Sequence, residues 1–439
     1  MESSNRRFYG WTIVASLWVI YFLNVGFPMY GGQTVNTFMS DEMQFNRTIL
    51  GLGFSLFNLF QGLPGPLIGY TIQKKGARFC MAIGSALILI AAVLMGYFVK
   101  NQWVFLFTFG IIAGVGVGFG TVVPVQTTVT QWFTKRRARA MAITLTASGF
   151  GGFIAAPLLT WVLDSTGKWN NCWLVVAGAA LLALLIDLFL IKDKPSDIGQ
   201  IPDGKADVEA ASGKKKPSFK PYMTEEKWTV KEALKNAKCW MVLLGALGLY
   251  IPYMMLVSHG IACLGDHGLS ATSAAFSMSL ITVTSIVGRL LGGELCNRMP
   301  ARYVWAGSLT VLLLGTICLM GASNVPLMVV YAACTGIGFG CSFVCMPVMF
   351  SSYFGADIYG SLFGTLFPII TICSSVSPAL AGTMYDASGS YTSAFIMVMA
   401  FNVLGIVAML LAKPPRKKQN STAPRPNGRA PPVTQPGSC

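Results

Sequence analysis

Long apolar stretches separated by short polar segments run along almost the whole chain. Windows of about 20 residues identify candidate membrane spans. There are twelve, at 9–33, 48–72, 79–98, 103–131, 138–162, 171–191, 238–264, 270–294, 302–322, 326–352, 358–384 and 391–412. A helix satisfies its backbone hydrogen bonds internally, as lipid requires. We therefore expect an all-α membrane protein with twelve transmembrane helices.

A polar segment interrupts this pattern at the middle of the chain. Residues 192–237 are rich in Lys, Asp and Gly, which is typical of a solvated linker. The pattern predicts a six-helix bundle at 1–191, a cytoplasmic linker at 192–237 and a second six-helix bundle at 238–412. The basic, Pro-rich tail at 413–439 is expected to be disordered in the cytoplasm.

The two halves repeat short motifs at offsets of 220 to 224 residues. A loop motif after the second span recurs after the eighth, Gly-Phe-Gly at 118–120 recurs at 338–340, and Pro157 recurs as Pro378. The loop residues are Gly69, Gln73, Lys74, Gly76 and Arg78 in the first half and Gly293, Asn297, Arg298 and Arg302 in the second. Parallel repeats of this kind predict two pseudo-symmetric bundles, which is typical of transporters.

Charge fixes the expected orientation. Only 11% of residues are charged, which excludes an ordinary soluble enzyme, and the net charge is +15. Of the 32 Lys and Arg residues, 28 fall on segments that share one side of the membrane. The positive-inside rule therefore predicts cytoplasmic termini and a multi-pass protein of a plasma membrane or bacterial inner membrane, with the lipid bilayer rather than nucleic acid as its surroundings.

The sequence contains little that indicates a catalytic site or a cofactor-binding site. The eleven cysteines include no CxxC pair, and the two histidines have no acidic partner within the spans. Alternating glycines at 114–120 could suggest a nucleotide loop, but they lie inside an apolar span and favour close helix packing. We expect no metal site, no cofactor and no enzyme activity.

One basic residue, Arg289, lies within a span. Ser285 and Gly293 stand one turn away and neither is acidic, and no acidic residue is plainly at mid-depth to neutralise it. An arginine inside the bilayer is costly, so it should face a partner or a wet cavity. An anionic substrate is the simplest partner, because the planar guanidinium suits a carboxylate. Alternatively, Arg289 snorkels to the interface or pairs with Glu294.

Other polar and aromatic side chains could complete a substrate site or carry protons. The substrate-binding candidates are Asn24, Tyr30, Gln33, Gln126, Thr144 and Tyr253. Gln126 and Arg289 fall at similar depth, so both could touch one substrate. His259 is the only histidine within a span and is the candidate for proton coupling, or else a hydrogen-bonded structural residue.

The loop motifs resemble the pattern G-x-L-a-D-[RK]-x-G-[RK] of the major facilitator superfamily, with Gln73 and Asn297 in place of its Asp. Within it, the chain resembles the oxalate/formate antiporter and monocarboxylate transporter branch. The residues concerned are Arg7-Phe-Tyr-Gly-Trp11, Trp132-Phe-Thr-Lys-Arg-Arg-Ala-Arg-Ala140, Val257-Ser-His259 with Gly268-Leu-Ser270, and Gly288-Arg289-Leu-Leu-Gly-Gly293. The resemblance implies that Arg289 binds the substrate carboxylate.

The same resemblance limits the class of substrate that we expect. Oxalate carriers have a second cation, a lysine, where this chain has Leu366, and animal monocarboxylate carriers have an acidic residue where this chain has Ser285. We therefore expect a secondary transporter of a monocarboxylate such as lactate, pyruvate or formate, working as a monomer by proton symport or anion exchange. The alternatives are an exporter of drugs or other solutes and a transporter-like nutrient sensor.

Overall fold

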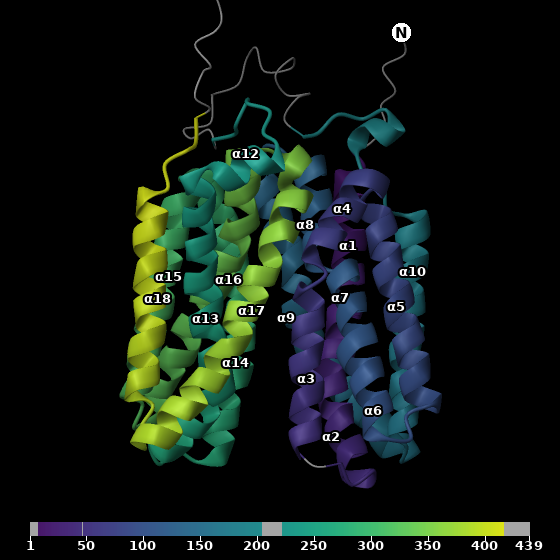
Figure 1. The fold of residues 1–439 in the computed structure, drawn as a ribbon, viewed down its shortest axis with the longest axis vertical. Coiled ribbons are helices and arrows are strands. Elements are labelled where there is room, and N and C mark those ends of the chain that lie inside the picture. The colour runs from purple at the N-terminus through teal and green to yellow at the C-terminus, as the bar shows by residue number, and fades with distance from the viewer. Residues whose placement is uncertain (1–7, 46, 204–221, 417–439) are drawn as a thin grey trace, which may run out of the picture.

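The computed structural model describes residues 8–45, 47–203 and 222–416, and these residues form long helices in two groups (Figure 1). The first group comprises α1 (Gly10–Val25), η1 (Gly26–Gly31), α2 (Gly32–Glu42), α3 (Arg47–Gly62), α4 (Gly65–Lys75), α5 (Ala77–Tyr97), α6 (Gln102–Phe105), η2 (Leu106–Ala113), α7 (Gly114–Gly120), α8 (Val122–Trp132), α9 (Arg137–Thr166) and α10 (Trp169–Phe189). The second comprises α13 (Ala237–Asp266), α14 (Ala271–Arg298), α15 (Ala301–Met320), α16 (Val325–Phe354), α17 (Ala356–Ser388) and α18 (Thr392–Leu411). A short helix, η3 (Pro195–Ile198), and α12 (Val230–Lys235) lie between the groups in sequence. Most of the predicted tail, at 417–439, and the linker residues 204–221 lie outside the described residues.

Eleven helical segments in the described part of the chain are long and apolar enough to cross a membrane. The expected span at 48–72 differs, because it is divided into α3 and α4 at Leu63 and Pro64. Proline has no backbone N–H and disfavours helical geometry in the residue before it, so it separates the two helices. The twelve predicted spans thus correspond to eleven long helical segments, of which Gln102–Trp132 is interrupted at Thr121, and one span divided between α3 and α4.

Glycines bring several helices into backbone contact. A Cβ added to Gly84 of α5 would collide with the backbone of Gly120 in α7, and one added to Gly26 of η1 would meet Gly151 of α9 at 2.8 Å. The glycines at 114–120 pack against α3 and α5, which confirms the prediction that they serve helix packing.

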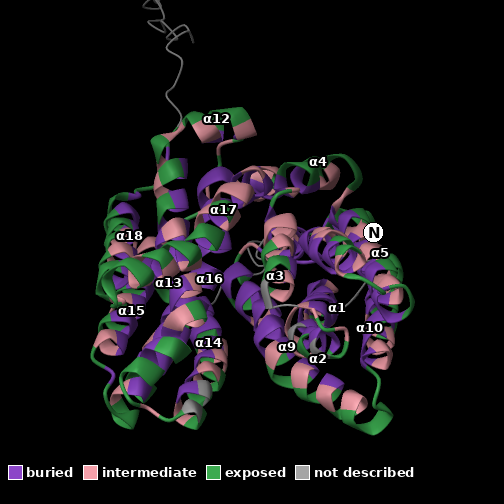
Figure 2. Ribbon diagram, turned by 60° about the horizontal axis from the view of Figure 1, so that its bottom comes forward, coloured by how far each residue is buried: buried purple, intermediate pink, exposed green. Residues whose placement is uncertain are grey.

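The two groups of helices meet near one end of the molecule. We call this the basic end, because Lys74, Lys75, Arg139 and Arg298 lie there, on the side of the chain ends in Figure 1. Toward the opposite end the two groups diverge (Figure 1). Figure 2 shows buried residues along α9 and α16, where the groups face each other, and many exposed residues on α18.

Candidate functional site

Close packing of α14 against α16 sets the position of Arg289. A Cβ on Gly288 would collide with the backbone of Ile337, and one on Gly340 would lie 2.9 Å from the Arg289 backbone nitrogen. Only glycine allows the two backbones to approach this closely. The Arg289 side chain is therefore held on a rigid helix pair.

The Arg289 guanidinium is buried and unneutralised. The residue is 3% exposed, and its Nε and Nη1 atoms are buried without a hydrogen-bond partner among the described residues. Its carbon Cζ lies 5.5 Å from the ring centre of Phe343 and 5.9 Å from that of Phe339, within cation–π range. These rings stabilise a positive charge but do not neutralise it. The alternative pairing with Glu294 is not formed, because that carboxylate binds two other arginines.

Four tyrosines from both groups of helices surround this charge. Tyr21 of α1, Tyr30 of η1, and Tyr250 and Tyr253 of α13 all lie within electrostatic range of the Arg289 guanidinium. The Tyr253 ring stacks on Phe339, with ring centres 3.7 Å apart. The structure therefore brings two predicted residues, Tyr30 and Tyr253, to Arg289. It adds Tyr21 and Tyr250, which the sequence did not single out.

Gly149 of α9 leaves room for the guanidinium from the first group. A Cβ added there would lie 3.0 Å from Arg289 Nη1. The cation is thus placed at the junction of the two groups, with donors and aromatic surfaces from each. This arrangement can bind a small anion that has an apolar body.

Gln126 and Thr144, two further substrate-binding candidates, form hydrogen bonds with groups other than Arg289. Gln126 is fully buried, and its Oε1 accepts a 2.6 Å hydrogen bond from the Tyr359 hydroxyl of α17, while its Nε2 has no described partner. Thr144 donates to the Ala140 carbonyl oxygen of its own helix. The side chain of Gln33 lies outside the described residues.

Asn24 makes its described hydrogen bonds within the first group of helices and not with Arg289. Its amide Nδ2 donates to Ser85 Oγ at 2.9 Å and to the Gly120 carbonyl oxygen at 3.5 Å. The described contacts of Asn24 therefore join α1 to α5 and α7.

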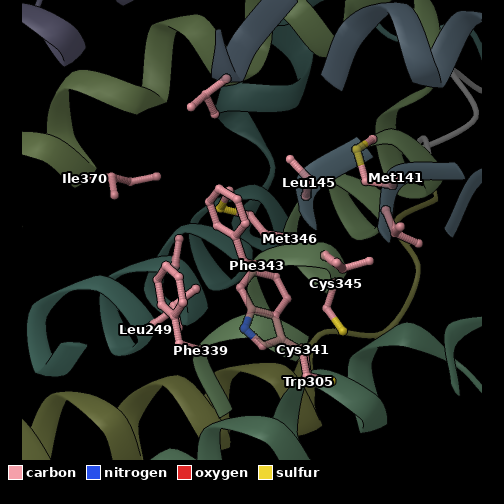
Figure 3. Close-up of a cluster of buried hydrophobic side chains, with 14 of the residues drawn as sticks. Met141, Leu145, Leu249, Trp305, Phe339, Cys341, Phe343, Cys345, Met346 and Ile370 are labelled. Carbon is pink, nitrogen blue, oxygen red and sulfur yellow. The ribbon is translucent and has the colours of Figure 1, made fainter. Parts of the chain in front are cut away.

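Hydrogen bonds close the basic end between the two groups. Ser361 Oγ donates to the Gly69 carbonyl oxygen at 3.1 Å, and Arg137 Nη1 donates to Ser351 Oγ at 3.0 Å. Apolar side chains fill the adjoining space, where Met141 and Leu145 of α9 and Phe343 and Met346 of α16 belong to one buried cluster (Figure 3). The two groups are therefore packed against each other at this end in the observed conformation.

The loop motif of the second half contributes an ion pair to this closure. Glu294 accepts from Arg139 of α9 at 2.7 Å and from Arg298 of its own helix at 2.8 Å. A Cβ added to Gly293 would collide with Ala142, so glycine permits the contact of α14 with α9. Arg302 instead stacks on Tyr303, with its Cζ 4.5 Å from the ring centre.

The loop motif of the first half also contacts the segment just beyond the end of α10. Gly76 has a φ of +90°, and a Cβ there would collide with the Asp193 carboxylate. The Arg78 backbone N–H donates to Asp193 Oδ1 at 2.8 Å. Burial raises the pKa of Asp193, and the N–H groups of Ala77 and Arg78 that donate to it oppose this shift. Gln73 and Lys74 are exposed at the end of α4, while Asn297 is half-buried.

His259 lies on α13 six residues beyond Tyr253, toward the end opposite the basic end. Its Nε2 lies 2.9 Å from the Pro378 carbonyl oxygen, which can only accept, and its Nδ1 lies 3.1 Å from the Tyr391 hydroxyl. Neutral imidazole with the proton on Nε2 satisfies both contacts. The geometry supports a structural role that ties α13 to α17 and to Tyr391.

Replacing His259 with alanine is expected to lower stability. Each lost hydrogen bond contributes about 0.5–1.5 kcal/mol, so the free energy of unfolding should fall by about 1–3 kcal/mol. Thermal unfolding in detergent measures the change, with His267→Ala, at an exposed position, as the matched control. Unchanged stability together with loss of proton-driven transport would instead assign His259 to proton coupling.

A model of the Major Facilitator Superfamily matches residues 17–262 and 261–436. The chain belongs to the Major Facilitator Superfamily. Human monocarboxylate transporter 14 is 25% identical over 92% of this chain and 90% of its own length. Monocarboxylate transporter 13 of Rattus norvegicus is 27% identical over 78% of this chain and 74% of its own length. The chain is therefore a membrane transporter of this superfamily, and it is similar over most of its length to monocarboxylate transporters.

Solved structures agree on the fold. The human organic anion transporter MFSD10 superposes with a TM-score of 0.66 at 16% identity, over 93% of this chain and 100% of that chain. The fucose:proton symporter of E. coli superposes with a TM-score of 0.65 at 17% identity, again over 93% and 100%. At this identity the similarity concerns the Major Facilitator fold.

Proposed function

We propose that this transporter is a secondary carrier of a small monocarboxylate of the lactate, pyruvate and formate class. It moves its substrate by alternating access, either with a proton or in exchange for another anion. The single observation that carries the proposal is the Arg289 guanidinium, which is buried at the junction of the two groups without an acidic partner in the described residues. A carboxylate supplies the missing negative charge and can accept two parallel hydrogen bonds.

The surroundings of Arg289 favour one carboxylate over two. Leu366, at the position where oxalate carriers have a lysine, is buried and apolar, so this position supplies no second cation for the other end of a dicarboxylate. Phe339, Phe343 and Tyr253 offer apolar surface for the rest of the substrate. The names of the relatives, monocarboxylate transporters 13 and 14, support the same substrate class.

We further propose that the basic end faces the cytoplasm, in a plasma membrane or bacterial inner membrane, as the distribution of Lys and Arg favours. The closed basic end then makes the observed conformation an outward-facing one. Because Arg289 and its tyrosines all come from one chain, a monomer suffices for transport.

Transport by purified protein in liposomes tests this proposal. Labelled formate, lactate, pyruvate and oxalate are offered with an inward proton gradient in one set and with unlabelled internal substrate in another. We expect uptake of a monocarboxylate and weaker uptake of oxalate. Uptake of none of these acids by folded protein would contradict the proposal and favour an exporter of other solutes or a sensor.

A further inference from the structure

A carboxyl group of the first group of helices is buried without a cation. Asp187 of α10 is fully buried, and its Oδ2 accepts a 2.7 Å hydrogen bond from Ser85 Oγ. Ser85 Oγ in turn accepts from Asn24 Nδ2, which also reaches the Gly120 carbonyl oxygen. The second oxygen, Oδ1, is buried with no hydrogen-bond partner in the described part of the chain.

The groups that surround Asp187 do not neutralise it. Cys80 of α5 lies within electrostatic range and is uncharged as a thiol, and Arg78 of α5 donates to the Leu188 carbonyl oxygen. Before α1, the Tyr9 hydroxyl donates to the Leu190 carbonyl oxygen. Four further titratable groups on neighbouring elements interact elsewhere: Tyr21 of α1 and Tyr30 of η1 lie within electrostatic range of Arg289, Arg137 of α9 donates to Ser351, and Arg139 of α9 pairs with Glu294. Asp193, just beyond α10, is itself acidic and adds no positive charge. An ionised carboxylate here would be an uncompensated buried charge, which is strongly unfavourable.

We propose that Asp187 is the proton-binding site of this transporter, separate from the carboxylate site at Arg289. In the observed conformation the carboxyl group holds a proton, so no net charge is buried. When the cycle admits water to the site, Asp187 releases this proton and becomes a carboxylate. The inference rests on the proposed carrier function and assigns proton symport to it.

The hydrogen bonds from Asp187 lead to a break in the fourth span. Gly120, which Asn24 contacts, ends α7, and Thr121 separates α7 from α8. Five residues further along α8, Gln126 accepts from Tyr359 across the closed basic end. A change of charge at Asp187 would alter the bonds of Ser85 and Asn24 and thereby the position of α8. These contacts connect the proton-binding carboxyl group to the break between α7 and α8.

Asp187→Asn tests this assignment, because the amide is neutral and nearly isosteric with a protonated carboxyl. Two assays are run in liposomes on the wild type, Asp187→Asn and the control Asp193→Asn, which changes a carboxylate just beyond the end of the same helix. Counterflow against unlabelled internal substrate requires a carrier but no proton gradient. Accumulation driven by an inward proton gradient requires coupling.

We expect Asp187→Asn to retain counterflow and to lose accumulation, so that internal substrate rises only to the external concentration. Asp193→Asn should behave as wild type in both assays. If Asp187→Asn still accumulates substrate, or if wild type shows counterflow without accumulation, the assignment of Asp187 is overturned while the carrier function stands. If wild type shows neither activity, the proposed function itself fails.

A spectroscopic measurement on the wild type keeps the inference testable if the variant does not fold. Infrared spectra at neutral pH should contain the carbonyl stretch of a protonated, buried carboxyl group, because Asp187 has no cation partner in the described structure. Absence of that band in folded wild-type protein would overturn the assignment.

Discussion

Replacing Arg289 with alanine is expected to abolish carboxylate uptake in a protein that still folds. The variant removes the charge that, in the proposed function, pairs with the substrate at the junction of the two groups. Truncating one partner of a buried charge pair costs about 2–5 kcal/mol, and each 1.4 kcal/mol is about tenfold in affinity. Uptake at low substrate concentration should therefore fall by roughly 30-fold or more.

Arg289→Lys should also be severely impaired, although it keeps the charge. Lysine is a point charge that cannot hold a carboxylate with two parallel hydrogen bonds. It also lacks the planar guanidinium that faces Phe339 and Phe343. A large loss in both variants would show that geometry as well as charge matters at this position.

The control for these variants is Arg298→Lys, an exposed arginine on the same helix whose partner is Glu294. It should transport normally, because exposed ion pairs contribute little. Thermal unfolding should show no large loss for Arg289→Ala, since the substitution removes an unneutralised buried charge. Normal uptake by both Arg289 variants would contradict the proposed anion site.

The helical spans were predictable because hydropathy reports directly on the membrane. The broken helices were not, since a window of about 20 residues averages over a local interruption. Pro64 and the glycines at 114–120 were visible in the sequence, but they can serve either packing or a break. In the structure Pro64 lies at a break between two helices. Gly120 has both roles, because it ends α7 and also packs against Gly84.

Arg289 could be identified from the sequence because a charged residue contrasts with the apolar span around it. Most of the residues that surround it in the structure show no such contrast. Tyr21, Tyr250, Phe339 and Phe343 look like ordinary apolar positions in sequence. Which of these side chains face the junction depends on how each helix is rotated about its own axis. A helix that is apolar on all sides has no hydrophobic periodicity from which this rotation can be predicted. The spacing of Phe339 and Phe343, one helical turn apart, was the available signal.

Contacts distant in sequence were also beyond prediction. Cys296 of α14 and Cys345 of α16 are 49 residues apart in sequence, yet their sulfur atoms lie 3.5 Å from each other. In the same way Glu294, considered as a partner of Arg289, binds Arg139 from the other group. Such contacts join residues that are distant in sequence and have no local sequence pattern in common, so they are seen only in the packed structure.

The contact of α4 with α17 offers a way to block the closed basic end. A Cβ added to Gly364 of α17 would lie 2.5 Å from the Gly65 carbonyl oxygen and 3.1 Å from the Gly69 backbone nitrogen. These neighbours are backbone atoms, which cannot rotate away as a side chain can. A leucine at position 364 therefore cannot fit while this end is closed.

Gly364→Leu is expected to shift the transporter toward a form that is open at the basic end. Overpacking of this kind costs about 1–3 kcal/mol, which corresponds to a roughly 5- to 150-fold change in the equilibrium between the two forms. Alternating access requires both forms, so uptake should fall steeply. Amide hydrogen exchange in α4, Gly65–Lys75, should become faster as its contact with α17 opens. Gly307→Leu is the matched control, because a Cβ there meets nothing within 4 Å. Wild-type uptake and unchanged exchange in Gly364→Leu would show that closure at α4 and α17 is not a step of the transport cycle.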